Sequence, residues 1–255
     1  MAASYQFLAP PGYGKLVPLD RQRHGALGLP LGDDHRWCSE LNAVHLNAPE
    51  FAKAAADYPI AFVRDPDSGE FAPVAVLGLR AKQNLFVGAD GRWQAHRYVP
   101  ATVRRYPFCI AELPQDKGPP QRLVCVEEAR LARGGTPLFA ADGSPSPAWQ
   151  QTQRLLEAVE GARLQTRVLS RRIEALGLLT PFEALALPKQ GQRMRLQGLF
   201  RVDEERLQAV PGRDLRVLMR KGELRAIYAH LLSLENFARL MDLALERDAA
   251  EAGKA

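Results

Sequence analysis

The segment "PIAFVRDPDSGEFAPVAVLGLR", residues 59–80, decides the fold class of this 255-residue chain. It holds two short runs, 59–64 and 72–80, that are rich in strand-forming residues and are bounded by turn residues. More strands of the same kind are predicted downstream: two in 84–99 around an Asp-Gly turn, one in 107–112 and one in 122–128. So many short strands within about seventy residues predict a mainly antiparallel sheet.

The spacing of the apolar residues changes after Pro147. Mostly apolar residues then recur at alternating spacings of four and three, which predicts one helix of about thirty residues that ends at Gly177. These positions are Leu155, Val159, Ala162, Thr166, Leu169, Ile173 and Leu176. We expect this helix to pack across the sheet, because Thr166 interrupts the apolar seam; a paired coiled coil is the alternative.

Shorter elements are predicted on both sides of this helix. One helix begins near Pro49 and must end before Pro59. The segment "TPFEALAL", 180–187, has the pattern of a short helix with Thr180 as its N-cap. The remaining predictions are a strand at 194–202 that returns to the sheet, a helix that begins at Asp203, and helices at 212–222 and 223–248.

These elements together predict an α+β fold, in which a mainly antiparallel sheet from the first half packs against long helices of the second half. We expect one domain that spans 1–255. Its β-rich part covers about 1–140, and its helical part covers about 147–250 with one returning strand near 193–202.

Composition restricts the class of protein. Hydrophobic residues make up 46% and charged residues 25%, which is typical of a globular chain, and the net charge is +5. The three cysteines, Cys38, Cys109 and Cys125, have no CxxC spacing, so we expect free thiols in a reducing compartment. The N-terminus lacks the pattern of a signal peptide and no run is long enough to span a membrane, which favours a cytoplasmic protein; signal-independent export stays open.

The segment "GRWQAHRYVPATVRRYPF", 91–108, carries four arginines and contains no acid. A strand over 92–99 would place Trp93 and Arg97 on one face and His96 on the other. "PATVRR" would then form one helical turn that ends at Arg104 and Arg105. Two interpretations stay open: a sheet face and a basic corner that grip a carboxylate or phosphate, or arginines that pair with acids elsewhere in the fold.

The histidines do not have the spacing of metal ligands, and no nucleophile-elbow, phosphate-loop or dinucleotide-binding motif is present. His230 shares a helix face with Ser233, a face that could line a cleft; the alternative is a hydrogen bond from this helix to the sheet. We therefore assign no catalytic residue, no metal site and no cofactor. The candidate binding residues are Trp93, His96, Arg97, Arg104, Arg105 and His230.

Several phrases, among them "FLAPPGYGKLVPLDRQRHG", "NLFVGADGRWQAHRYVPATVRRYPF" and "LRAIYAHLLSLENFARL", occur in the order found in one bacterial family. Over about residues 5–245 the chain resembles the SapC family named after surface-layer loci, which is distinct from the peptide-transport permease of the same name. The resemblance implies genes near flavin-dependent halogenase-like proteins, cupin-like proteins and outer-membrane receptors. It transfers no catalytic residue.

Three functions follow from these observations. The first is a non-enzymatic cytoplasmic accessory protein that binds a protein or peptide partner, with an anionic ligand as a further option. The second is a small-molecule-binding protein or enzyme that acts beside a halogenase-like or cupin-like partner, and the third is a surface-layer component. Nucleic acid is not an expected partner, because the basic segment is short and no binding module is visible. The sequence leaves the oligomeric state open.

Overall fold

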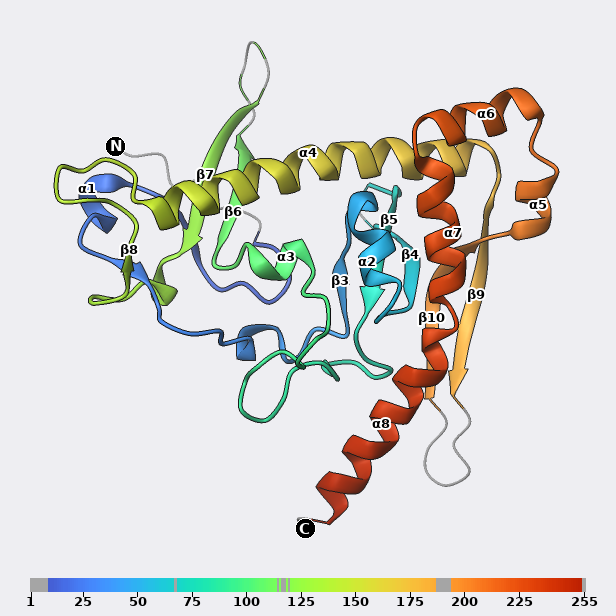
Figure 1. Ribbon diagram of the computed structural model, residues 1–255, viewed down its shortest axis with the longest axis horizontal. Helices are drawn as coiled ribbons and strands as arrows, with labels where there is room; N and C mark the ends of the chain where they lie inside the picture. The colour runs from blue at the N-terminus through green and yellow to red at the C-terminus, as the bar shows by residue number, and fades with distance from the viewer. Residues whose placement is uncertain are drawn as a thin grey trace.

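The largest sheet of the computed structural model has five antiparallel strands (Figure 1). The structure describes residues 9–66, 68–113, 115, 118, 120–186 and 194–253. The strands, in their order across the sheet, are β3 (Ala43–His45), β5 (Phe71–Val76), β4 (Ile60–Arg64), β10 (Met194–Val202) and β9 (Leu179–Ala186). The fold is α+β, and the predicted antiparallel sheet is confirmed.

Two smaller sheets lie beside this one. A three-stranded sheet has the order β1 (Leu16–Pro18), β7 (Gln121–Glu127) and β6 (Phe108–Leu113), and a two-stranded sheet pairs β2 (Gly28–Leu29) with β8 (Thr136–Pro137). Short helices connect these strands: α1 (Arg21–His24), η1 (Arg36–Cys38), η2 (Ala48–Glu50), α2 (Phe51–Ala54), α3 (Ala101–Arg104) and η3 (Glu128–Arg130).

Helix α4 (Pro147–Ala175) joins the sheets into one body, because it contacts β5, β6 and β8 along its length (Figure 1). It begins after Ser146, whose hydroxyl accepts the Trp149 N–H at 3.1 Å, and it is followed by Gly177 at φ +65°. The predicted helix is confirmed, and it packs across the sheet.

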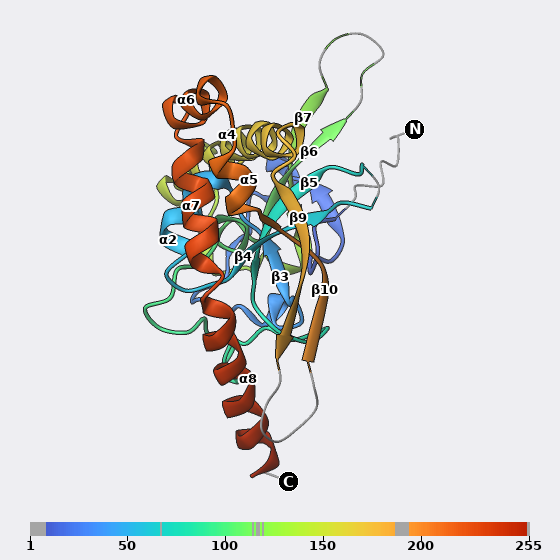
Figure 2. The same ribbon diagram turned by 90° about the vertical axis from the view of Figure 1, so that its right-hand side faces the viewer.

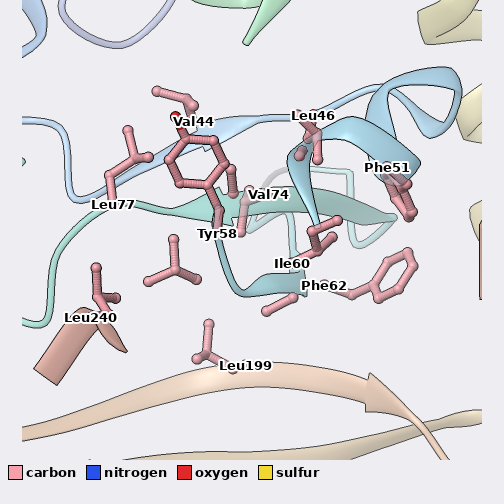
Figure 3. Packing of buried hydrophobic residues seen from close by; sticks show 14 of the residues in the cluster. Val44, Leu46, Phe51, Tyr58, Ile60, Phe62, Val74, Leu77, Leu199 and Leu240 are labelled. Atoms are coloured by element: carbon pink, nitrogen blue, oxygen red, sulfur yellow. The ribbon is translucent and has the colours of Figure 1, made fainter. Parts of the chain in front are cut away.

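Of the remaining helices, α7 (Glu223–Ser233) and α8 (Asn236–Ala252) cover one face of the five-stranded sheet, where they contact β4, β10 and β9 (Figure 2). Helix α6 (Gly212–Arg220) packs against α7, and α5 (Glu204–Gln208) follows β10. Between sheet and helices lies the main core, where Ile60, Phe62 and Leu199 of the strands meet Phe51 of α2 and Leu240 of α8 (Figure 3). All five side chains are buried, and this burial provides most of the favourable free energy of folding.

The prediction of two paired strands in 84–99 is wrong. A single bridge joins Val87 to Trp93, and His96 has a positive φ of 62°, which no strand residue adopts. The Arg247 guanidinium of α8 donates to the backbone carbonyls of Asn84, Leu85 and Val87, so a tertiary contact replaces the strand ladder.

The tight turn at Asp90-Gly91 is nevertheless present, with Gly91 at φ +81°. A side chain at this position would also meet Arg36 at 2.7 Å. We expect Gly91→Val to lower the free energy of unfolding by about 3 kcal/mol, because a β-branched residue is strained at positive φ. Urea denaturation measures the change. As a control, Gly161→Ala within α4 should stabilise the protein by about 0.5 kcal/mol, because a Cβ there meets nothing; an unchanged midpoint for Gly91→Val would contradict the turn.

The helix predicted at 180–187 is also wrong, because residues 179–186 form strand β9. Thr180 lies opposite Arg201 of β10 and Phe182 lies opposite Leu199. The Phe182 ring also packs against Phe237 of α8 at 5.9 Å. Partners far away in the sequence therefore override a capping pattern that would support little more than two helical turns.

The single helix predicted at 223–248 is two helices, α7 and α8, which separate after Ser233. The Ser233 hydroxyl accepts the Ile60 N–H at 2.9 Å, and the Asn236 amide donates to the Ala55 carbonyl at 2.7 Å. Both side chains hold the helix break against the chain that enters β4, and apolar periodicity carries no information about such bonds.

The three cysteines are free and buried, as predicted. Burial raises the pKa of the Cys38 thiol to about 12 and that of Cys109 to about 11. In the described part of the chain, none of the helices has the length and apolarity needed to cross a membrane.

Candidate functional site

The six residues singled out in the sequence do not converge on one pocket. Trp93 is buried in the core, where its indole N–H donates to the Tyr58 hydroxyl at 3.0 Å. His230 is completely buried, and its ring bonds to the backbone of Ile60 and Val202. Both residues are therefore positioned to support the fold.

His96, Arg97 and Arg104 lie on the surface. Arg97 donates to Asp57 at 2.9 Å, and Arg104 donates to the Val99 carbonyl at 3.0 Å while its guanidinium lies over the Tyr98 ring. His96 is exposed at its turn. The expected shared face of 92–99 is absent, because this segment is not a strand.

Arg105 differs from Arg104 because its side chain points inward and is only 13% exposed. Its Nη1 lies 3.4 Å from the Glu160 carboxylate of α4. Glu160 also accepts a shorter bond from Arg163, at 2.8 Å. The Arg105 guanidinium is thus held near a carboxylate that already has a closer partner.

Glu50 sets the position of α3 and of both arginines. One oxygen of its carboxylate accepts the Ala101 N–H at 2.7 Å and the Tyr98 hydroxyl at 2.8 Å. The other oxygen accepts the Asn47 N–H at 3.0 Å as part of a capping box at the start of η2. Burial and this carboxylate raise the pKa of Tyr98 to about 12.

Arg105 lines a cavity of about 530 Å³. Strands β3 and β5 form one wall, α4 forms a second, and α3 with Trp37 and Leu41 closes one end. We call it the α4 cavity. Its volume is within the range of small-molecule sites.

Three buried hydrogen-bond donors line the α4 cavity without an acceptor among the described residues. They are Nδ2 of Asn47, Nε of Arg105 and Oγ of Ser170. Asn47 is 6% exposed and Ser170 is 2% exposed. A buried donor without an acceptor typically costs about 1–3 kcal/mol, and native proteins contain few of them. Three in one cavity indicate a place for acceptor atoms of a ligand.

The donors are spread along the cavity. Arg105 lies beside Glu160 of α4, and Ser170 is ten residues further along the same helix, a separation of about 15 Å. Asn47 is close to the Ser170 end, because the neighbouring Ala48 N–H donates to Thr166 at 2.8 Å. The cavity is therefore elongated, with donors toward both ends.

The remaining charged side chains at the cavity are paired or less basic than usual. Arg167 forms a bidentate ion pair with Glu70, at 2.6 and 3.0 Å. Loss of solvent around the His45 ring, and secondly the nearby Arg105, lower the pKa of His45. At neutral pH the cavity therefore offers Arg105 as a buried cation next to a neutral imidazole.

The sequence interpretation missed the other two donors. A signal for Asn47 exists in "NAPE", where a capping box uses the Asn47 oxygen and leaves its amide N–H groups free. A serine within a helix interior usually reflects local bonding or solvent, so Ser170 carried no signal. Among the described residues, no group of three or more His, Cys, Asp and Glu side chains could hold a metal ion.

Comparison with known proteins gives one match. The family model described as SapC matches residues 19–240. No curated protein and no solved structure matches the chain.

Proposed function

The chain belongs to the SapC family, and we propose that it is a binding protein that holds an elongated carboxylate ligand in the α4 cavity. One observation carries the proposal: three buried donors line the same cavity and find no acceptor in the described part of the chain. A carboxylate supplies acceptors only, and a buried arginine is the side chain best suited to bind it.

The remainder of the lining indicates the body of the ligand. Val63, Phe71 and Val159 contribute apolar surface to the lining of the α4 cavity. Because the donors lie toward both ends, the best fit is an organic acid with its carboxylate at Arg105, an apolar chain in the middle, and a second acceptor group at Asn47 and Ser170.

Binding rather than catalysis is supported by the chemistry of the unpaired groups. Ser170 is the only nucleophile among the three donors, and no described base lies within hydrogen-bond distance of its hydroxyl. A serine without a base is a weak nucleophile at neutral pH. The proposal therefore assigns no reaction to the cavity.

The experiment uses decanedioate, decanoate and the neutral 1-decanol as probes, with affinity measured by calorimetry. We expect affinity in the order decanedioate, decanoate, decanol, and a loss of about tenfold or more for decanoate with Arg105→Gln. The matched control is Arg104→Gln, one residue away and outside the cavity, which should leave affinity unchanged. Ser170→Ala should lower the affinity for decanedioate more than the affinity for decanoate. It should not destabilise the free protein, because it removes an unpaired hydroxyl.

Equal affinity for the acids and the alcohol would overturn the proposal, and so would equal effects of the two arginine variants. The cytoplasmic location and the surface-layer alternative are separate from this cavity, and both stay predictions. The predicted accessory role needs a surface for a partner protein in addition, and α4 has a groove on its other side.

A further inference from the structure

Helix α4 forms the wall of two different hollows. Val159, Thr166 and Ser170 face the α4 cavity, whereas Val168 and Arg172 line a groove. Since successive helix residues are rotated by about 100°, the two sets lie on roughly opposite sides of α4. The groove is therefore a separate hollow on another side of the helix.

The groove has a volume of about 700 Å³ and is enclosed by helical segments. Its walls are η2 with α2, the middle of α4, and the junction at Gly222 between α6 and α7. We call it the α4–α7 groove. The backbone N–H and C=O groups of these helical walls are already hydrogen-bonded, so a partner cannot pair with them as an added strand. A partner segment must form its backbone hydrogen bonds within itself, as an α-helix does.

The groove has an apolar surface that is open to solvent. Val168 of α4 lines it and is 51% exposed; Leu164, one turn earlier on the same helix face, is 43% exposed. Pro49 and Ala52, on the opposite wall, are also exposed. An apolar strip between two helical walls matches the apolar face of an amphipathic helix.

The rim of the groove is strongly basic. Lys53, Arg172, Lys221 and Arg225 surround the apolar strip, and of the described residues that line the groove only Glu223 is acidic. Glu223 is paired with Arg172 at 3.1 Å. Among the described residues, the other three cations form no ion pair within 4.0 Å, so the groove presents about three net positive charges.

From this combination we propose that the α4–α7 groove docks an acidic amphipathic helix of a partner protein. The apolar face of that helix lies on Val168 and Ala52, and its acidic flanks meet Lys53 and Arg225. Complementary charge would raise the association rate and select an acidic partner, while apolar contact supplies most of the affinity.

The probe is a fluorescein-labelled, amidated helical peptide with leucine at positions i, i+3, i+4 and i+7 and glutamate on its flanks. Fluorescence anisotropy should show saturable binding to the full chain, weakened by added salt. The same peptide with lysine for glutamate should not bind. Lys53→Glu combined with Arg225→Glu should lower the affinity for the acidic peptide at least tenfold. The double variant should also bind the lysine peptide more tightly than the acidic one.

Controls separate this proposal from the cavity. Lys15→Glu combined with Arg133→Glu changes the net charge equally at exposed positions outside the groove and should alter affinity less than threefold. Arg105→Gln should not change peptide binding, and Val168→Ser should weaken it while far-ultraviolet circular dichroism stays the same. The proposal is overturned if the acidic peptide fails to bind, if the groove variants bind it as the wild type does, or if only phosphatidylglycerol vesicles bind.

Discussion

Replacing His230 with alanine should lower the free energy of unfolding by about 4 kcal/mol. Strands β4 and β10 are paired directly at Phe62–Phe200 and Val63–Leu199. The same register would place Ile60 opposite Val202, but there the imidazole lies between the two strands. Its Nε2 accepts the Val202 N–H at 3.0 Å and its Nδ1 lies 2.8 Å from the Ile60 carbonyl, to which it donates.

Alanine at this position removes two buried bonds and leaves a cavity beside Phe62, whose ring centre is 5.1 Å from that of the imidazole. Each unpaired backbone group costs about 1–3 kcal/mol, and the lost packing adds to this cost. Guanidinium denaturation measures the change. His96→Asn is the control, since asparagine tolerates the positive φ of that exposed residue and should shift stability by less than about 0.5 kcal/mol.

The same histidine should make stability depend on pH. Burial lowers the pKa of His230 to about 4, well below the ordinary value of 6.5. The unfolded chain therefore binds a proton between pH 6.5 and 4 that the folded chain does not bind. This contribution to stability is complete above pH 6.5 and is lost as the pH falls through 4, for a total of roughly 3 kcal/mol.

The test compares the unfolding free energy of the wild type and of His230→Gln at several pH values from 7 to 4. The wild type should lose roughly 3 kcal/mol more than the variant over this range, because glutamine does not titrate. Parallel pH profiles would show that the imidazole does not bridge the strands in its neutral form.

Segments whose own residues determine their conformation were predictable from the sequence. The run at 59–64 and the helix α4 are close to their predicted ranges, whereas β5 ends at Val76, four residues before the end of the predicted run at 72–80. Strand β9 and the segment 84–99 were not predictable, because their conformation depends on β10 and on Arg247 of α8. Such partners are far away in the sequence and leave no local pattern.

The candidate site was likewise predictable from the sequence only in part. Composition located the basic pair at the end of α3, but a single helical turn does not reveal which arginine points inward. Arg105 points inward, where it lies beside Glu160 of α4, so the predicted alternative of an internal ion pair describes Arg105. Arg104 stays exposed. Asn47 and Ser170 become recognisable only when the tertiary fold has placed both of them at the α4 cavity.

Glu50→Ala should cost about 4 kcal/mol and should also weaken ligand binding in the α4 cavity. The variant leaves the N–H groups of Asn47 and Ala101 and the Tyr98 hydroxyl without their acceptor, and the two N–H bonds lie in buried surroundings. A buried donor that loses its acceptor costs about 1–3 kcal/mol. Decanoate affinity should fall as well, because this carboxylate fixes both the start of η2 and the start of α3.

Chemical denaturation gives the stability, and calorimetry at 10 °C, where the variant is still folded, gives the affinity. Glu50→Gln should have an intermediate cost, since its amide oxygen can keep the bonds from Ala101 and Tyr98 while its NH₂ group then opposes the Asn47 N–H. The control is Glu40→Ala, whose carboxylate is 70% exposed and 3.8 Å from Lys82, with an expected change below about 0.5 kcal/mol. A stable Glu50→Ala protein with full decanoate affinity would mean that α3 and Arg105 hold their positions without this carboxylate. It would contradict the inference that Glu50 couples η2 to the α4 cavity.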